Sequence, residues 1–160
     1  MRLGHALALF LLVPLAARAQ QAESLALTAP DGQTVTIDRT DYGVPRIHAS
    51  TEPALFFGQG FATAQDRLFQ METFWRAATG RLAELQGAGA LAQDRSVRTV
   101  FYTPAERAAQ FDALPAPVRA MMEAYIAGIN TYIDSTEAHP ARYLPAQYQG
   151  GGFLPERWDA

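Results

Sequence analysis

The feature that most constrains the fold of this chain is a line of apolar side chains that recurs at steps of four and three residues. Its members are Phe57, Phe61, Ala64, Leu68, Met71 and Trp75. Because an α-helix has 3.6 residues per turn, this spacing places all six on one helix face, which must be buried. Ser50 or Thr51 can cap the start of the helix, and Gly80 is a typical stop. The pattern predicts one long helix between these residues.

A second apolar stripe predicts another helix over about residues 117–135. The stripe consists of Val118, Met121, Met122, Tyr125, Ile126, Ile129, Tyr132 and Ile133. A shorter helix is expected over residues 105–111, begun by Thr103 and Pro104. From His139 onward, three prolines and the glycines at 150–152 indicate an irregular loop that bears aromatic residues.

Strand signals are confined to the region before the long helix. Residues 34–39 alternate β-branched with polar side chains, and residues 45–49 form a second candidate strand. Residues 41–45 join them with turn chemistry, since Gly43 tolerates positive φ and Val44 precedes a proline. The expected fold class is therefore α+β, mostly helical with a short β-hairpin, and we find no linker that would divide the chain.

Two glycines lie inside the predicted long helix. Gly58 and Gly60 each cost about 1 kcal/mol relative to alanine there, so we expect them to allow close backbone contact with a neighbouring element. Together with Gln59 they resemble the beginning of a dinucleotide-binding fingerprint, but Thr63 stands where its third glycine belongs. Packing is the better explanation.

The first nineteen residues have the organisation of a signal peptide. Arg2 supplies the positive charge, residues 6–16 are apolar, and Ala17-Arg18-Ala19 is a small-x-small cleavage site that would leave Gln20 as the new terminus. The apolar run is shorter than the ~20 residues that span a bilayer. We therefore expect residues 1–19 to be a signal peptide, residues 20–160 to be periplasmic or secreted, and no membrane association.

Several kinds of chemistry are absent from the sequence. All 13 basic residues are arginines, the net charge is −3, and there is no cysteine, which argues against nucleic-acid binding and excludes thiolate chemistry. No serine lies in a Gly-x-Ser-x-Gly elbow, and no metal-binding spacing occurs. His48 and His139 have no base or ligand partner at a recognisable spacing, so we interpret both as structural or solvated.

Seven motifs, in order along the chain, give it a resemblance to the penicillin acylase family, closest to the penicillin G acylase branch. They are residues 39–47 (RTDYGVPRI), 58–62 (Gly-x-Gly-x-Ala), 64–72 (AQDRLFQME), 80–84 (GRLAE), 124–130 (AYIAGIN), 144–148 (LPAQY) and 152–158 (GFLPERW). Two positions depart from the family pattern: Thr40 stands where an acid is usual, and Arg46 where histidine is usual. The resemblance covers nearly everything after the leader.

The resemblance implies an N-terminal-nucleophile hydrolase with an αββα core, made as a precursor and cut into an α chain and a larger β chain. A serine at the start of the β chain attacks an amide, and its α-amino group serves as the base. The family also implies calcium. Its α-chain pocket residues and calcium ligand lie downstream of the arginine-tryptophan motif, so we expect residues 20–160 to be an incomplete α-chain segment that is inactive alone. We assign no catalytic, cofactor-binding or metal residue.

The remaining expectations concern structure and partners. We expect Asp66 and Arg67 to belong to a polar pairing network, with a solvated ion pair as the equal alternative. The apolar face from Phe57 to Trp75 is expected to dock on the β chain of a heterodimer. Two rival functions stay open: an acylase for other N-acyl compounds, such as N-acyl homoserine lactones, and a secreted, non-catalytic binding module.

Overall fold

The computed structural model describes residues 24–148 and 153–159; the predicted signal peptide and the glycines at 150–152 lie outside these ranges. Its elements are β1 (Leu25–Thr28), β2 (Thr34–Arg39), β3 (Pro45–His48), α1 (Glu52–Thr79), α2 (Ala83–Gln86), a 3₁₀ turn (Gly87–Ala90), α3 (Leu91–Val100), α4 (Pro104–Asp112), α5 (Ala116–Ala138), α6 (Pro140–Tyr143) and a second 3₁₀ turn (Ala146–Tyr148). The α+β class is confirmed.

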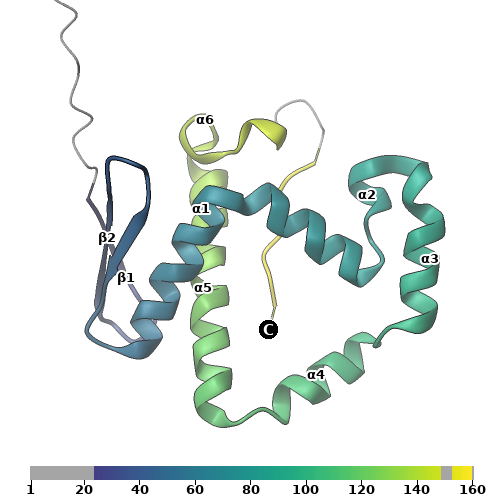
Figure 1. Ribbon diagram of the computed structural model, residues 1–160, viewed down its shortest axis with the longest axis horizontal. Coiled ribbons are helices and arrows are strands. Elements are labelled where there is room, and N and C mark those ends of the chain that lie inside the picture. Colours follow the sequence, from purple (N-terminus) through teal and green to yellow (C-terminus); the bar gives the residue numbers. More distant parts are fainter. Residues whose placement is uncertain (1–23, 149–152, 160) are drawn as a thin grey trace, which may run out of the picture.

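The strands form an antiparallel sheet in the order β1-β2-β3, which lies beside the first half of α1 (Figure 1). The predicted hairpin is β2-β3, with Ile37 opposite Ile47. The prediction missed β1, whose Leu27 pairs with Val35. Four residues are too few for a strong period-2 signal, so tertiary pairing decides this strand. Val35 and Ile37 are buried against α1.

Helix α1 begins and ends as predicted. Thr51 is the cap, accepting a hydrogen bond from the Ala54 amide, and Gly80 ends the helix in the left-handed conformation at φ 68°. The helix is not continuous, because Arg67 has non-helical dihedral angles of φ −141° and ψ 19°. This kink separates a first half that packs on the sheet from a second half that leads toward α2 (Figure 1).

The core lies where α1 crosses α5, the most extensively packed pair of elements. A β-carbon on Gly60 would collide with the backbone carbonyl of Tyr125, and one on Gly128 would collide with that of Phe57. A β-carbon on Gly58 would lie 2.6 Å from Val35 Cγ1. The expected role of Gly58 and Gly60 in close packing is confirmed.

The apolar face of α1 differs from the predicted docking surface. Phe57, Phe61, Ala64 and Leu68 are fully buried within this chain, in one core cluster with residues of the sheet and of α5. Docking on a β chain is therefore not their role, because the side chains already have partners. The expectation treated the helix as unpartnered, whereas α5 supplies a complementary stripe.

Two further regions differ from expectation. Helices α2 and α3 were not predicted. They are joined by a side-chain cap, because Asp94 of α3 is buried and accepts hydrogen bonds from the amides of Leu82 and Ala83 at the start of α2, each at 2.8 Å. The region after His139 contains α6 and a 3₁₀ turn in place of a plain loop. In this region Tyr148 is buried.

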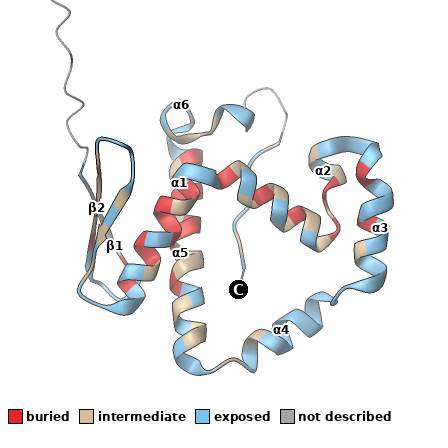
Figure 2. Ribbon diagram, in the orientation of Figure 1, coloured by how far each residue is buried: buried red, intermediate tan, exposed pale blue. Residues whose placement is uncertain are grey.

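Helices α3 and α4 return the chain from the far end of α1 to the start of α5, and their surfaces are mostly exposed (Figure 2). Helix α4 agrees with the helix expected over residues 105–111, and α5 extends the one expected over 117–135. In the described ranges, no helix combines the length and apolar character that crossing a bilayer requires.

Candidate functional site

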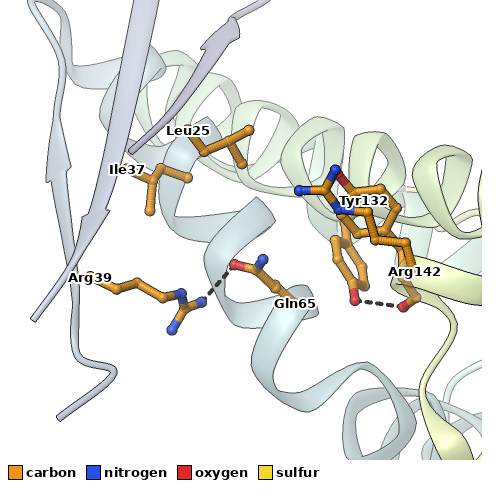
Figure 3. A pocket seen from close by; sticks show the side chains of 7 residues that line it. Leu25, Ile37, Arg39, Gln65, Tyr132 and Arg142 are labelled. Atoms are coloured by element: carbon orange, nitrogen blue, oxygen red, sulfur yellow. Dashed lines mark hydrogen bonds between the residues drawn. The ribbon is translucent and has the colours of Figure 1, made fainter. Parts of the chain in front are cut away.

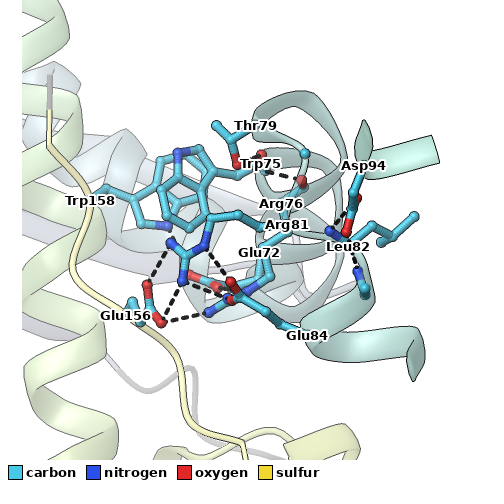
Figure 4. A network of polar contacts seen from close by, with 12 residues as sticks. Glu72, Trp75, Arg76, Thr79, Arg81, Leu82, Glu84, Asp94, Glu156 and Trp158 are labelled. Atoms are coloured by element: carbon cyan, nitrogen blue, oxygen red, sulfur yellow. Dashed lines mark hydrogen bonds and ion pairs between the residues drawn. The ribbon is translucent and has the colours of Figure 1, made fainter. Parts of the chain in front are cut away.

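The most elaborate polar feature surrounds Arg76, in the second half of α1. We call it the Arg76 network; it comprises Glu72, Arg76, Arg81, Glu84, Glu156 and Trp158 (Figure 4). Arg76 and Glu72 have no exposed side-chain surface. A buried charge is tolerated only where it is paired and hydrogen-bonded, so this cluster is a demanding part of the fold.

The Arg76 guanidinium is surrounded by acids. Its Nε donates to Glu72 Oε2 at 3.2 Å, and Nη1 donates to Glu84. Its Nη2 lies 3.2 Å from Glu156 Oε1 but lacks hydrogen-bond geometry. The ring of Phe153 covers the guanidinium, with the Arg76 Cζ 4.4 Å from the ring centroid. The cation is thus compensated by charge and by an aromatic face.

A second, partly exposed arginine, Arg81, also binds the carboxylates of Glu84 and Glu156. Arg81 forms a double pair with Glu84 and another with Glu156, all four contacts lying between 2.7 and 3.0 Å. These hydrogen bonds raise the pKa of Arg81, and those that Arg81 donates to Glu156 lower the pKa of that carboxyl. Bidentate pairs of this kind fix geometry as well as charge.

Trp158 closes the network. Its indole Nε1 donates to Glu72 Oε1 at 2.9 Å, and its ring stacks on that of Trp75 with a centroid separation of 6.1 Å. Burial raises the pKa of Glu72, although the hydrogen bonds from Trp158 and Arg76 oppose that effect. Asn130 of α5 holds the Trp158 backbone, accepting from its amide at 2.8 Å and donating to its carbonyl at 2.9 Å.

A second cluster, the Arg39 network, consists of Arg39, Gly43, Gln65 and Asp66. Arg39 Nη2 lies 2.8 Å from Asp66 Oδ1 and donates to Gln65 Oε1 at 2.6 Å, while Nη1 donates to the Gly43 carbonyl at 2.7 Å. The expected pairing of Asp66 is confirmed. The expectation for Arg67 is wrong: it is exposed at the kink, without an ion pair inside the described ranges.

A pocket of about 450 Å³ lies beside the Arg39 network (Figure 3). Leu25 and Ile37 form an apolar wall, opposite Tyr132 of α5. The Tyr132 hydroxyl donates a hydrogen bond to the Tyr143 carbonyl at 2.7 Å. Burial raises the pKa of Tyr132. The hydroxyl therefore stays neutral near physiological pH, and the pocket walls present no activated nucleophile.

The other candidate groups are also placed in non-catalytic surroundings. His48 is exposed on the sheet, with Nε2 3.5 Å from Asp38 Oδ2, and His139 lies between α5 and α6. The Ser50 hydroxyl donates to the Gln33 amide oxygen, and that of Ser135 to a backbone carbonyl. No described residues gather into a cluster of three or more metal-binding side chains.

Sequence reasoning missed the charged core of the Arg76 network. Glu72 lies within the family motif at residues 64–72, but Arg76 lies in no such motif. The available signal was their spacing: Leu68, Glu72 and Arg76 follow one another at steps of four, so the charges continue a buried line. An opposite-charge pair on an otherwise apolar helix face is a sign of a buried ion pair.

Comparison with known proteins gives one consistent result. The family model described as penicillin amidase matches residues 34–160. Penicillin G acylase of Escherichia coli is 37% identical over 134 residues, which are 84% of this chain and 16% of that protein. The penicillin acylase 2 proenzyme of Pseudomonas sp. (strain SE83) is 40% identical over 133 residues, 83% of this chain and 16% of the proenzyme.

Related proteins with another substrate name also match. An acyl-homoserine lactone acylase of Pseudomonas aeruginosa is 36% identical over 129 residues, 79% of this chain and 14% of that protein. Among solved structures, a thermostable penicillin G acylase from Alcaligenes faecalis superposes with a TM-score of 0.71 at 35% identity, covering 79% of this chain and 66% of that one. This chain thus spans about one sixth of the length of its curated relatives.

Proposed function

This chain belongs to the penicillin amidase family, and from that premise we propose that it is the scaffold-forming N-terminal part of an amidase that hydrolyses the side-chain amide of penicillins or related N-acyl compounds. The observation that carries the proposal is the convergence of the family motifs. Residues 64–72, 80–84 and 152–158 are far apart in sequence, yet they supply Glu72, Arg81, Glu84, Glu156 and Trp158 to one network.

The proposed reaction needs a nucleophile from polypeptide other than this chain. A serine at the terminus of a β chain attacks the amide carbonyl, and its own α-amino group takes the proton. An α-amine has a pKa of about 7.7–8.0, so a useful fraction is neutral near physiological pH, unlike a lysine. The acyl group is held as an ester on the serine, and water then releases the acid.

In this proposal the described residues position helices and perform no chemistry. This is supported by the hydrogen bonds of their hydroxyl groups. Those of Tyr132, Ser50 and Ser135 each donate to an amide or backbone oxygen. Glu72 of the Arg76 network and Asn130 of α5 together hold Trp158 in place. The family resemblance implies pocket residues downstream of this motif, and in our proposal the network helps to set their position.

Export and calcium belong to the same proposal. The leader at residues 1–19 would direct the protein to the periplasm or outside the cell. The family resemblance implies calcium with ligands outside residues 20–160, and the described side chains form no cluster of three or more metal-binding residues that could hold the ion. We therefore derive no step through the ion.

The acyl preference has two candidates. Relatives named penicillin G acylase and relatives named acyl-homoserine lactone acylase match with similar identity, 37% and 36%. The resemblance of residues 144–148 and 152–158 favours the penicillin G acylase branch. A panel of phenylacetyl amides and N-acyl homoserine lactones would discriminate between the two.

The test compares the 160-residue chain with the product of its reading frame extended beyond codon 160. We expect no hydrolysis of a phenylacetyl amide by the purified chain and clear hydrolysis by the extended product after processing. A stop codon directly after Ala160, or hydrolysis by the 160-residue chain, would overturn the proposal.

A further inference from the structure

The segment from Arg95 to Ala113, which we call the α3–α4 arm, contains no buried side chain. Only Val97 and Phe111 are partly covered, and Figure 2 shows the arm as almost wholly exposed. It is nevertheless regular. Helix α4 begins with a complete capping box, in which Thr103 and Glu106 satisfy each other's backbone amides.

A helix as short and exposed as α4 is not stable on its own in water. Helices shorter than ~12–15 residues are marginal in isolation, and most helical stability in proteins comes from packing an apolar face. Helix α4 has nine residues and buries none. The described residues bury no side chain of the arm, so its helices would gain stability from an additional surface.

The arm also carries a run of three consecutive large apolar side chains. Val100, Phe101 and Tyr102 are 75%, 63% and 60% exposed. Large aromatic side chains are typical anchors of protein interfaces, and Phe101 and Tyr102 lie exposed where α3 ends and α4 begins.

We propose that the α3–α4 arm is a docking element for the remainder of the acylase, with Val100, Phe101 and Tyr102 as its anchor. This rests on the proposed function. The curated relatives are about six times the length of the matched region, so the partner that this scaffold would meet is a much larger polypeptide. A second copy of the chain fits less well, since three side chains cover well under the ~800 Å² per partner of a stable interface.

The test uses the tagged 160-residue chain co-expressed with the part of Escherichia coli penicillin G acylase that lies outside the matched region. The double variant Phe101→Asp/Tyr102→Asp places charges in the anchor. The matched control is Tyr42→Asp, because Tyr42 is also a tyrosine and is 95% exposed at the β2-β3 turn. We expect the double variant to lower recovery of the co-purified partner about tenfold or more, and the control to leave it unchanged.

Hydrogen exchange supplies a second readout. We expect the α4 amides to exchange much faster than those of α5 in the chain alone and to become protected in the complex. Equal partner recovery with the double variant, failure of the unaltered chain to bind, or a chain dimer abolished by Tyr102→Asp would each overturn the inference. A complex that forms through the arm but hydrolyses no amide would contradict the proposed function alone.

Discussion

The indole of Trp158 donates its hydrogen bond to a carboxylate 86 positions earlier in the chain, that of Glu72, at 2.9 Å. Since Asn130 holds the backbone of the same tryptophan, this single residue joins α1, α5 and the segment 153–159. Closing so long a loop carries a large entropic cost, so the contact persists only because the packed helices and the hydrogen bonds of Trp158 offset it.

Replacing Trp158 by phenylalanine tests this relationship. The ring that stacks on Trp75 is largely kept, but Glu72 Oε1 loses its donor inside the protein. An unsatisfied buried acceptor costs about 1–3 kcal/mol, and more where it is charged. We expect Trp158→Phe to lower the free energy of unfolding by that amount, measured by urea denaturation.

Trp75→Phe is the matched control for that variant. It removes an indole N–H from the other member of the stacked pair, and no hydrogen bond of that N–H occurs among the described residues. The loss should be clearly smaller than for Trp158→Phe. Equal losses would mean that ring packing, and not the hydrogen bond to Glu72, carries the effect.

The crossing of α1 and α5 predicts a strong penalty at two glycines. A β-carbon on Gly60 or Gly128 would meet the backbone of the facing helix, which cannot move aside as a side chain can. We expect Gly60→Ala and Gly128→Ala each to lower the free energy of unfolding by about 1–3 kcal/mol or more. Thermal denaturation followed by circular dichroism would measure it.

Gly89→Ala serves as the control, because a β-carbon there meets nothing within 4 Å. We expect this variant to be neutral or to stabilise by about 0.4–1 kcal/mol through a less flexible unfolded chain. Tolerance of alanine at both Gly60 and Gly128 would show that the two helices are not in backbone contact.

Periodicity and turn chemistry predicted most of the framework. The apolar stripe from Phe57 to Leu68 and the alternation of residues 34–39 are local patterns that can be read from the sequence alone. Both correspond to elements of the structure. The glycine at position 60 similarly indicated close packing, since nothing else explains its cost in a helix. The partner could not be named, because the contact with Tyr125 is set by the three-dimensional crossing.

What the sequence did not reveal depends on contacts between distant residues. The cap of α2 comes from Asp94, twelve positions after the amide of Leu82 that it accepts from, and no local motif contains both. The same holds for Arg76, whose acids come from three segments. The family motifs contained the other members of this network but not Arg76, and they did not indicate that these residues meet.

The Arg39 network predicts a measurable coupling between the sheet and α1. Arg39 and Asp66 are partly exposed, at 25% and 40%, so screening by water limits how much their ion pair contributes to stability. A double-mutant cycle with Arg39→Ala and Asp66→Ala should give a coupling energy of about 0.5–1 kcal/mol. Arg46→Ala is the control on the neighbouring strand; coupling to Asp66 as large as that of Arg39 would contradict the assignment.

The Arg76 network also predicts how stability depends on pH. Hydrogen bonds from Arg81 lower the pKa of Glu156 below its ordinary value of 4.5, so the stability it contributes is present above pH 4.5 and is lost as pH falls through the lowered value. Burial raises the pKa of Glu72, and its contribution has the opposite sign: it is present below pH 4.5 and is lost as pH rises through the raised value.

Glu156→Gln isolates the acid-side part of this dependence. Because Glu156 is about half exposed, at 47%, we expect its contribution to be no more than about 1 kcal/mol. Urea denaturation should show that the unaltered chain loses stability more steeply than Glu156→Gln as pH falls below 4.5, so the two curves converge in acid. Glu123→Gln, on the exposed surface of α5, should follow the unaltered chain throughout. Parallel curves for the unaltered chain and Glu156→Gln across this range would mean that the pairs from Arg81 and Arg76 do not hold the Glu156 carboxylate in solution.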